Sequence, residues 1–547
     1  MEYSSTVTTP SPTIDHRPRI LAIILSVGVI AVMLLALSYK VFELDRYFIP
    51  KELVLNGAAF IVAVVVLTGG RIHRLDAVDA LIASFIVWSS VSALLASNHW
   101  IAQRSLAVSF ASAIIFWGAR RASEGGMHRM LLGAAATASV VAAVTSLAQA
   151  YGFESDWFTL ARAPGGTLGN RNFIAHVAAI GLPSILWCVV AAKHGIARAC
   201  ALLGAAIVAV TLVLSRSRAA WLALIAFVVI GIVMLLVSRK YWRGIPIGAR
   251  ITTAFVATAL GGTLAVILPN TLEWKSDSPY LDSARNVVDY SSGSGKGRIS
   301  QYMNSFEMSK HNPIFGVGPG NWPVQYTRYA PGGDKSLTDN GMTANPWPSS
   351  DWVAFVSERG FVGALLILGA FALLFFGSLR RWREVDDADL LMMKLALAGT
   401  IVITAIVSAF DAVLLLPAPA FLAWMIIGAS VGPRRGGREI DSRSGRYALL
   451  VPAILFITAI GVARSATETA AMISVGTGGR TAGWVTGAFW DPGSFRINQR
   501  VADIYARRGN CNRSRPFARR AVALFPRSAQ ARSTARRCGI KLNPLPH

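Results

Sequence analysis

Charged side chains are scarce in this sequence. They make up 15% of its 547 residues, against about 25% in an average soluble domain. Hydrophobic residues account for 53%, and the mean hydropathy is +0.48. A soluble protein could not bury so much apolar surface, and the composition also excludes a disordered or collagen-like chain. The sequence therefore predicts an all-α polytopic membrane protein.

Several short motifs are also missing. The chain has only four cysteines and no Cys-x-x-Cys pair, so a structural zinc site is not expected. It has no His-Glu-x-x-His, Gly-x-Ser-x-Gly or EF-hand pattern. These absences argue against a zinc hydrolase, a serine hydrolase and a calcium site, so we expect neither metal nor cofactor.

Thirteen stretches are candidate membrane spans, since a helix needs about 20 residues to cross a hydrocarbon core about 30 Å thick. They lie near residues 20–39, 53–69, 76–96, 105–119, 130–151, 172–192, 199–214, 219–238, 251–268, 352–377, 390–410, 415–431 and 447–464. No small-residue cleavage site follows the first span, which we interpret as an uncleaved signal anchor. The predicted parts are an N-terminal segment 1–19, a first bundle part 20–268, a large loop 269–350, a second bundle part 351–466 and a tail 467–547.

Basic residues in the short loops predict the orientation, because Lys and Arg concentrate on the cytoplasmic side. With a cytoplasmic N-terminus, the inner loops hold 21 Lys and Arg residues and the short outer loops hold 8. Much of the formal net charge of +24 is therefore a topology signal, and no nucleic-acid partner is expected. Thirteen spans place the tail outside with the large loop. Twelve spans would leave it in the cytoplasm.

The tail 467–547 is strongly basic, with 14 basic and three acidic residues. Such charge predicts contact with anionic lipid headgroups or an acidic glycan. Small residues near the spacing of one tetratricopeptide repeat predict packed helices; the residues are Ala502, Tyr505, Gly509, Ser514, Ala518, Ala521 and Pro526. In an oxidising compartment Cys511 and Cys538 could form a disulfide, and two free thiols are the alternative.

Charged and amide residues at the membrane boundary are costly and therefore informative. Arg216 and Arg218 interrupt an apolar stretch between the seventh and eighth spans. Their guanidinium groups match phosphate geometry, although interfacial arginines in a tight turn would look the same. Asn170 and Arg171 follow a glycine-rich segment at the entry to the sixth span, which suits either close approach of backbone to a ligand or a plain turn and cap. Arg298 lies in a second glycine-containing segment of the large loop.

Two carboxylates lie seven residues apart at the start of the tenth span. Asp351 and Glu358 fall about two helical turns apart, so we expect them on one helix face. Such acids can line a site or can anchor the helix through salt bridges. Asn321 lies in the glycine-rich stretch 316–322 of the large loop and is a candidate ligand-binding amide.

These segments together resemble the O-antigen ligase and O-antigen polymerase superfamily, the GT-C membrane glycosyltransferases of the bacterial envelope. The resemblance covers roughly residues 160–430 and rests on five patterns. They are Thr167-Leu168-Gly169-Asn170, Ser217-Arg218, Gly297-Arg298, the stretch from Asn312 to Gly318, and Glu358-x-Gly360-x-x-Gly363.

The resemblance implies a multi-pass protein of the bacterial inner membrane whose periplasmic face polymerises or ligates glycans. The implied donor is an undecaprenyl-pyrophosphate-linked glycan, and the acceptor is a hydroxyl of a glycan or a lipid. Positive charge would stabilise the pyrophosphate leaving group, with Arg218 as first choice, then Arg216 and Arg298. Other polysaccharide-assembly proteins are further candidate partners.

The family's ligases place a histidine eleven residues before the first glycine of Gly-x-x-Gly, where this chain has Ser349. Because serine is no base at neutral pH, we assign Asp351 as the acceptor-activating group. Glu358 would support it or pair with Arg359. The alternative is that Asp351 only caps its helix.

Two other functions fit the composition. A transporter or flippase of lipid-linked glycan would show inverted repeats and charges at mid-depth, whereas the charges here gather at the outer boundary. A non-catalytic assembly protein would explain the missing histidine.

Overall fold

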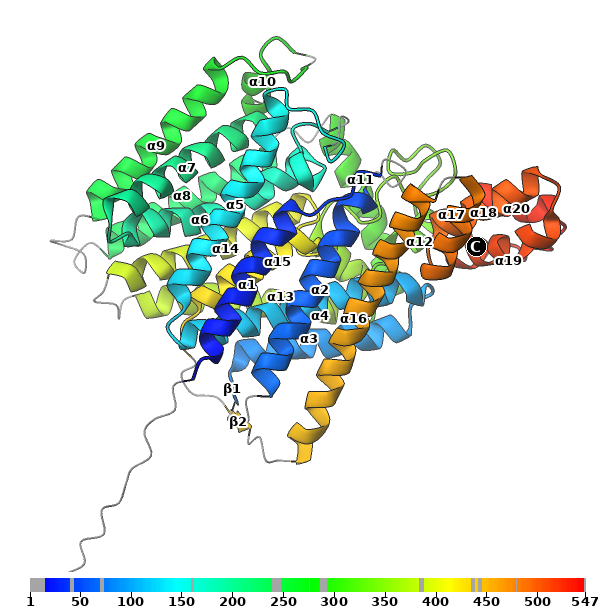
Figure 1. Cartoon of the computed structure of the whole chain (residues 1–547), viewed down its shortest axis with the longest axis horizontal. Helices are drawn as coiled ribbons and strands as arrows, with labels where there is room; N and C mark the ends of the chain where they lie inside the picture. The colour runs from blue at the N-terminus through cyan, green and yellow to red at the C-terminus, as the bar shows by residue number, and fades with distance from the viewer. Residues whose placement is uncertain are drawn as a thin grey trace, which may run out of the picture.

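The chain forms a bundle of long helices, followed by a small helical tail (Figure 1). The computed structural model describes residues 15–39, 44–68, 73–158, 162–238, 247–274, 276–285, 293–382, 388–433, 438–440, 445–478 and 480–545. Within them, twelve helices are long and apolar enough to cross a membrane, which confirms the all-α polytopic class. They are α1 (Arg17–Leu34), α2 (Asp45–Leu67), α3 (Ala77–Leu94), α4 (His99–Glu124), α5 (His128–Ala150), α6 (Arg171–Ala191), α7 (Gly195–Ser215), α8 (Arg218–Val237), α9 (Ile247–Ile267), α13 (Asp351–Trp382), α14 (Ala388–Phe410) and α16 (Gly445–Thr477).

The predicted span near 415–431 is the short helix α15 (Pro417–Ser430). Its 14 residues reach about 21 Å, less than the hydrocarbon thickness of about 30 Å. Every residue of α15 is buried, so no part of this helix has to face lipid. The prediction of twelve or thirteen spans is therefore confirmed, with α15 as a short thirteenth helix that its neighbours enclose.

A two-stranded sheet nevertheless indicates that α15 joins the two ends of the bundle. Strand β1 (His73–Leu75) precedes α3, and β2 (Arg438–Ile440) follows α15. The two strands pair antiparallel, so both connections lie at the same end of the bundle. The chain then returns along α16, and the tail emerges at the opposite end. We call this opposite end, which also carries the large loop 269–350, the outer end.

Small and branched apolar residues form the core around α6, α14 and α15. α6 is almost entirely enclosed because its sequence, rich in Ala, Ile, Leu and Val, lets neighbouring helices approach closely from all sides. The large loop folds back over the outer end of this core. It contains α10 (Pro279–Arg285), α11 (Gly293–His311), α12 (Trp322–Gln325) and the 3-10 turn η4 (Tyr326–Arg328); a second 3-10 turn, η2 (Gly166–Leu168), precedes α6.

α13 is kinked at Gly360. This glycine has a φ of 72°, in the left-handed region that favours glycine. A Cβ at Gly360 would lie 2.0 Å from the carbonyl oxygen of Ile314, so only glycine fits. The kink presents the backbone of residues 357 and 358 to the large loop, where Val317 and Gly318 donate hydrogen bonds to it.

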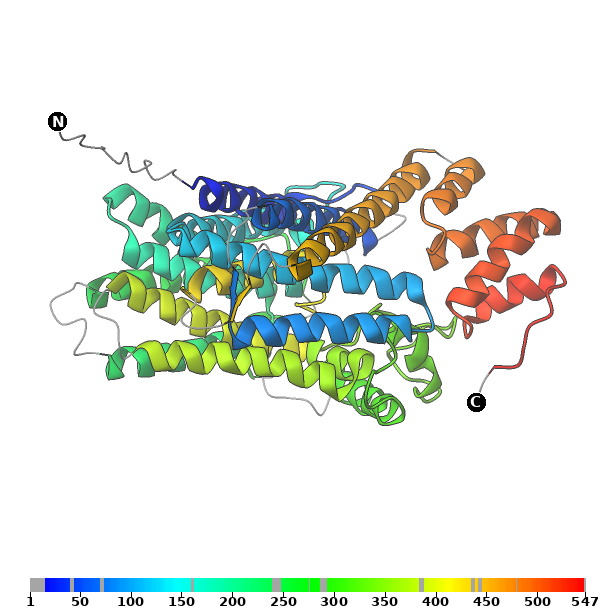
Figure 2. The same cartoon turned by 90° about the horizontal axis from the view of Figure 1, so that it is seen from below.

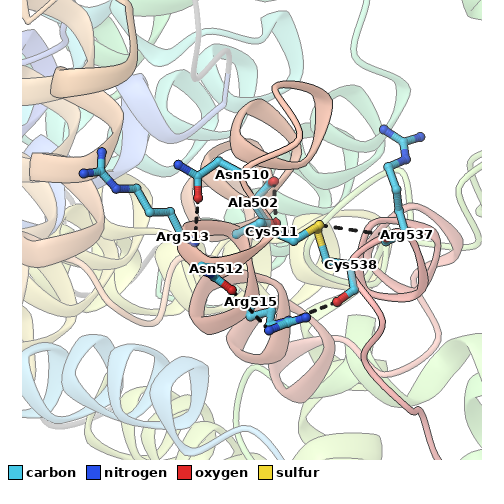
Figure 3. The surroundings of a disulfide bond; sticks show 9 residues. Ala502, Asn510, Cys511, Asn512, Arg513, Arg515, Arg537 and Cys538 are labelled. Carbon is cyan, nitrogen blue, oxygen red and sulfur yellow. Dashed lines mark hydrogen bonds between the residues drawn. A yellow bond between two sulfur atoms is a disulfide. The ribbon is translucent and has the colours of Figure 1, made fainter.

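The tail stands beyond the outer ends of the bundle helices (Figures 1 and 2). α16 continues to Thr477, past the predicted boundary at 466, and is followed by α17 (Arg480–Trp490), α18 (Phe495–Arg507), α19 (Cys511–Leu524) and α20 (Ala529–Arg537). α18 and α19 form a hairpin around Gly509, whose φ is 71°. The hairpin buries Ala502, Ser514, Ala518 and Ala521, as the small-residue spacing predicts. A disulfide joins Cys511 to Cys538 (Figure 3).

Hydrogen bonds join the tail to the large loop and to the α3–α4 turn. The Ala529 amide donates to the Asn340 carbonyl at 3.0 Å, and the Asn98 side chain donates to the Leu524 carbonyl at 3.1 Å. The tail and the large loop therefore lie on the same side of the bundle.

A buried charge cluster anchors the tail to the bundle. Arg104 of α4 makes two hydrogen bonds of 2.8 Å to Glu52 of α2 and lies 3.5 Å from Glu468 of α16. Arg464 of α16 pairs with Glu468 at 2.8 Å and lies 3.7 Å from Asp491 at the end of α17. This cluster therefore couples the position of the tail to the ionisation of its carboxylates.

We expect attachment of the tail to weaken as the pH rises from about 4 to about 7. Burial and the negative charge of Glu468 raise the pKa of Asp491 to about 7, against the opposing effect of Arg464. Because an unfolded aspartate titrates near about 3.9, the folded state binds more protons in this interval, and stability falls as they are lost. Hydrogen exchange of α17 and α18, corrected for intrinsic rates, should be faster at pH 8 than at pH 5. Asp491→Asn should remove the difference, and equal protection of the wild type at both pH values would contradict this expectation.

Candidate functional site

The glycine-rich segment before α6 is folded tightly and fixes the start of that helix. Gly165 and Gly166 donate backbone hydrogen bonds of 2.9 Å to the Gln149 side chain. Gly169 has a φ of 72° and packs against the Tyr47 ring, where a Cβ would lie 2.3 Å from the nearest ring carbon. Asn170 is buried and caps α6, because its side chain accepts a hydrogen bond from the Asn172 amide at 3.0 Å. Asn170 thus positions its neighbour Arg171 at the outer end.

Two of the predicted arginines meet at one indole ring. The guanidinium of Arg171 lies 5.2 Å from the centre of the Trp274 ring, and that of Arg216 lies 4.6 Å from it. The Arg216 Nε also donates a hydrogen bond of 2.8 Å to the Ser283 hydroxyl. The large loop thus supplies Trp274 and Ser283 as supports for arginines that come from α6 and from the α7–α8 turn.

Arg216 has an unusual backbone conformation. Its φ is 53°, which makes it the one non-glycine residue with positive φ among the described residues. An L-residue in this region costs roughly 1–2 kcal/mol. Arginine offers no backbone advantage at such a position, so the side chain is the reason we infer for its presence.

The arginine pair carries positive charge that no carboxylate neutralises directly. Within the described parts of the chain, neither Arg171 nor Arg216 forms an ion pair. Arg162 lies close by, because its carbonyl accepts a hydrogen bond from the Arg171 amide at 3.0 Å. Partial burial lowers the pKa of Arg216, while Asp282 opposes that effect, and an arginine stays charged at neutral pH. The arrangement is suited to an anion with several oxygens.

Arg218 begins α8, two residues after Arg216, and is half-buried. The Trp221 indole holds the turn by donating a hydrogen bond of 2.9 Å to the Leu212 carbonyl. Both α6 and α8 start at the outer end, so the positive ends of their helix dipoles add to the charge of the arginines.

A second group of residues forms where α11 meets the α14–α15 turn. The Tyr302 hydroxyl of α11 lies 2.6 Å from the Ser349 carbonyl and 2.9 Å from the Ala409 carbonyl. Arg298 is one helical turn before Tyr302 on the same face of α11. Asp411 follows two residues after Ala409, and its carboxylate lies 3.5 Å from the side-chain amide of Asn172 in α6.

The surroundings of the Asp351 carboxylate differ from those expected for a reactive base. It is fully buried, and its carboxylate accepts hydrogen bonds from the Val413 amide at 3.0 and 3.1 Å and from the Leu414 amide at 2.7 Å. Ser350 accepts from the Val353 amide at the start of α13. The geometry favours a structural role for Asp351, in which its carboxylate holds the α14–α15 turn. The assignment of Asp351 as the acceptor-activating base stays a prediction.

Glu358 and Arg359 form a buried ion pair at 3.1 Å. Glu358 also accepts a hydrogen bond from the Trp322 amide at 3.4 Å, and the guanidinium of Arg359 lies 5.6 and 5.2 Å from the ring centres of Phe85 and Phe355. No hydrogen bond or ion pair among the described residues joins Glu358 to Asp351. The helix-anchoring alternative for Glu358 fits these contacts.

Asn321 is fully buried and bonded on both sides of its amide. It accepts from the Asn98 amide at 2.8 Å and donates to the Asn98 carbonyl at 3.1 Å. These bonds attach the large loop to the α3–α4 turn. The structure does not bring Asn321 together with the arginines.

Several residues of the site were missed from the sequence. Trp274, Ser283 and Tyr302 carry no motif, because their importance depends on what the fold places beside them. Asp411 did carry a signal, since it is a lone charge between the apolar stretches of α14 and α15. That is the same signal that identified Arg216.

The comparison with protein families agrees with the predicted resemblance. Residues 203–368 match the family model described as O-antigen ligase, from within α7 to within α13. The matched segment contains Arg216, Arg218, Trp274 and Arg298. It confirms the resemblance to the O-antigen ligase and polymerase superfamily of membrane glycosyltransferases. No curated protein matches the chain.

Proposed function

We propose that the protein is a glycosyltransferase of the bacterial inner membrane. It transfers glycan from undecaprenyl pyrophosphate to a hydroxyl of a second glycan or a lipid, and so polymerises or ligates repeat units. The observation that supports this most is the pair of arginines at Trp274, neither of which has an ion-pair partner among the described residues. Arg216 and Trp274 lie within the matched family segment.

The arginines suit the demands of this reaction. When the anomeric carbon leaves pyrophosphate, negative charge concentrates on the departing oxygens, and fixed positive groups stabilise it in the transition state. Arg171, Arg216 and Arg218 start from the outer ends of α6, α7 and α8, near the level of lipid headgroups. Arg298 of α11 would supply a further charge, because it lies one helical turn before Tyr302, which contacts the end of α14. The leaving group is therefore neutralised by the chain's own side chains.

The reaction is assigned to the periplasmic side. The excess of basic residues in the inner loops supports a cytoplasmic N-terminus. The outer end would then face the periplasm, and the tail with it. The disulfide between Cys511 and Cys538 agrees with an oxidising compartment.

We assign a negatively charged partner to the tail. All three of its acidic residues, Glu468, Asp491 and Asp503, are buried. Its exposed surface carries the arginines 496, 500, 507, 508, 513, 515, 519, 520, 536 and 537. Anionic headgroups or an acidic glycan would be attracted to such a surface, and other polysaccharide-assembly proteins are further candidates.

Deletion of the gene tests the function. We expect undecaprenyl-linked single repeat units to accumulate in the outer leaflet, because they are flipped but not transferred. Accumulation in the inner leaflet would instead indicate a flippase and contradict the proposal. An unchanged profile of surface polysaccharides and lipid-linked intermediates would also contradict it.

Substitution of Arg218 by lysine tests the contribution of the guanidinium group. Lysine keeps the charge but loses the planar pair of donors, so we expect most activity to be lost while the protein inserts and accumulates normally. Near-normal product chains from Arg218→Lys would rule out bidentate binding at this residue.

A further inference from the structure

None of the residues considered above for activating the acceptor hydroxyl is both ionisable and accessible. The acceptor hydroxyl needs a proton acceptor within hydrogen-bond reach as it attacks the anomeric carbon. Ser349 is no base, and the carboxylate of Asp351 is buried and occupied by backbone amides. Glu358 is likewise buried in its ion pair. A different group is required if the proposed transfer takes place.

Asp411 lies at the place where the predicted site elements converge. It directly follows α14, and one carboxylate oxygen accepts a hydrogen bond from the Ala412 amide at 2.9 Å. The other oxygen lies 3.5 Å from the side-chain amide of Asn172, the residue after Arg171. Asp411 is therefore held beside the start of α6, where the arginine pair also begins.

The large loop also contacts the end of α14, two residues before Asp411. Tyr302 contacts the carbonyls of both Ser349 and Ala409, so these two atoms are no further apart than the sum of the two short distances. The Gln301 side chain accepts a hydrogen bond from the Ser349 amide at 2.7 Å, which fixes the same segment to α11. The segment that ends in Ser349 and the turn that contains Asp411 therefore lie close together.

The carboxylate of Asp411 is half-buried, and the described residues give it no ion pair. The ionisable side chains on the elements that meet at this turn are His176 of α6, Arg298 of α11 and Asp351 of α13. His176 is itself 1% exposed and lies one turn deeper than Asn172, so an acceptor from the outer side meets Asp411 first. One carboxylate oxygen has only a long contact to Asn172, which leaves it able to accept a further proton or hydrogen bond.

We propose that Asp411 is the catalytic residue that takes the proton of the acceptor hydroxyl, with Asn172 as its positioning residue. The inference rests on the proposed function. The acceptor O–H bond breaks and its proton moves to the Asp411 carboxylate. The acceptor oxygen forms a bond to the anomeric carbon. The bond from that carbon to the pyrophosphate oxygen breaks, and the electron pair leaves with undecaprenyl pyrophosphate beside Arg171 and Arg216.

The test uses the full-length protein in lipid nanodiscs with a synthetic undecaprenyl-pyrophosphate-linked glycan. Asp411→Asn keeps the shape and the hydrogen bond from Ala412 but cannot accept the proton. We expect donor binding to stay within about twofold of the wild type and turnover to fall at least about 100-fold, the lower range for general-base catalysis. Asp411→Glu should recover part of the rate. Asp339→Asn, which changes an exposed acid of the large loop, is the control and should be fully active.

The pH profile distinguishes a base from a structural group. The wild-type rate should fall at acid pH because the base must be ionised, and the residual rate of Asp411→Asn should lack that fall. Full activity in Asp411→Asn would overturn the inference, and so would a loss of donor binding in parallel with turnover. A wild-type protein that binds donor but never releases undecaprenyl pyrophosphate would instead defeat the proposed function.

Discussion

Replacing Arg216 by glycine should remove most glycan transfer and leave the protein at least as stable as the wild type. Glycine adopts the positive φ of this position without steric cost. Relief of a strain of roughly 1–2 kcal/mol, less an entropy cost of about 0.5–1 kcal/mol for glycine, leaves a backbone gain of about 1 kcal/mol. The same change removes the guanidinium from Trp274 and Ser283. Loss of one preorganised charged donor from a transition state lowers turnover about 100-fold or more.

Two measurements on one variant check this expectation. Polysaccharide chains from cells that express Arg216→Gly should be short or absent, while the purified variant should melt at or above the wild-type temperature. Arg216→Lys is the matched control, because it keeps the charge in the strained backbone and should fall between the two. An active Arg216→Gly would show that the guanidinium is dispensable. Unfolding of this variant would show that the side chain is needed for packing.

Among the variants proposed here, Arg359→Met should cause the largest loss in the free energy of unfolding. Arg359 is fully buried, and its partner Glu358 would be left as an uncompensated buried charge. Removing one member of such a pair costs about 3–5 kcal/mol. Methionine fits between the rings of Phe85 and Phe355 that surround the guanidinium, so the loss would come from the unpaired charge and not from a cavity.

The double variant Glu358→Gln with Arg359→Met tests that explanation. Glutamine can still accept the hydrogen bond from the Trp322 amide, and neither side chain of the pair is then charged. We expect the double variant to recover most of the melting temperature that Arg359→Met loses. Equal destabilisation of the single and double variants would locate the cost in packing around the Gly360 kink.

Most of the fold could be predicted because membrane helices depend on local composition. Apolar runs of about 20 residues identified all twelve helices of the described residues that are long enough to span a membrane. α15 was overestimated because hydropathy reports the apolar character of a segment and not its enclosure by neighbours. The continuation of α16 to Thr477 was missed because Arg464 and Glu468 look like the end of a span, whereas they pair with each other inside a buried cluster.

The candidate site was only partly predictable, since a sequence shows residue types and not their partners. Arg171 and Arg216 were identified as boundary charges, but the ring of Trp274 that both approach lies in a loop more than 50 residues further along than Arg216. Asp351 looked like an accessible acid, yet the amides of Val413 and Leu414 occupy its carboxylate. Contacts between segments so distant in sequence leave no local pattern.

Release of undecaprenyl pyrophosphate by the purified protein is the decisive test of the proposed glycan transfer. The full-length chain in nanodiscs would receive the synthetic lipid-linked glycan and an acceptor glycan, with lipid product and lengthened glycan measured together. We expect the wild type to form both in equal amounts and Arg216→Gly to form less than about one hundredth as much. Equal product from wild type and Arg216→Gly, or glycan transfer without release of the lipid pyrophosphate, would contradict it.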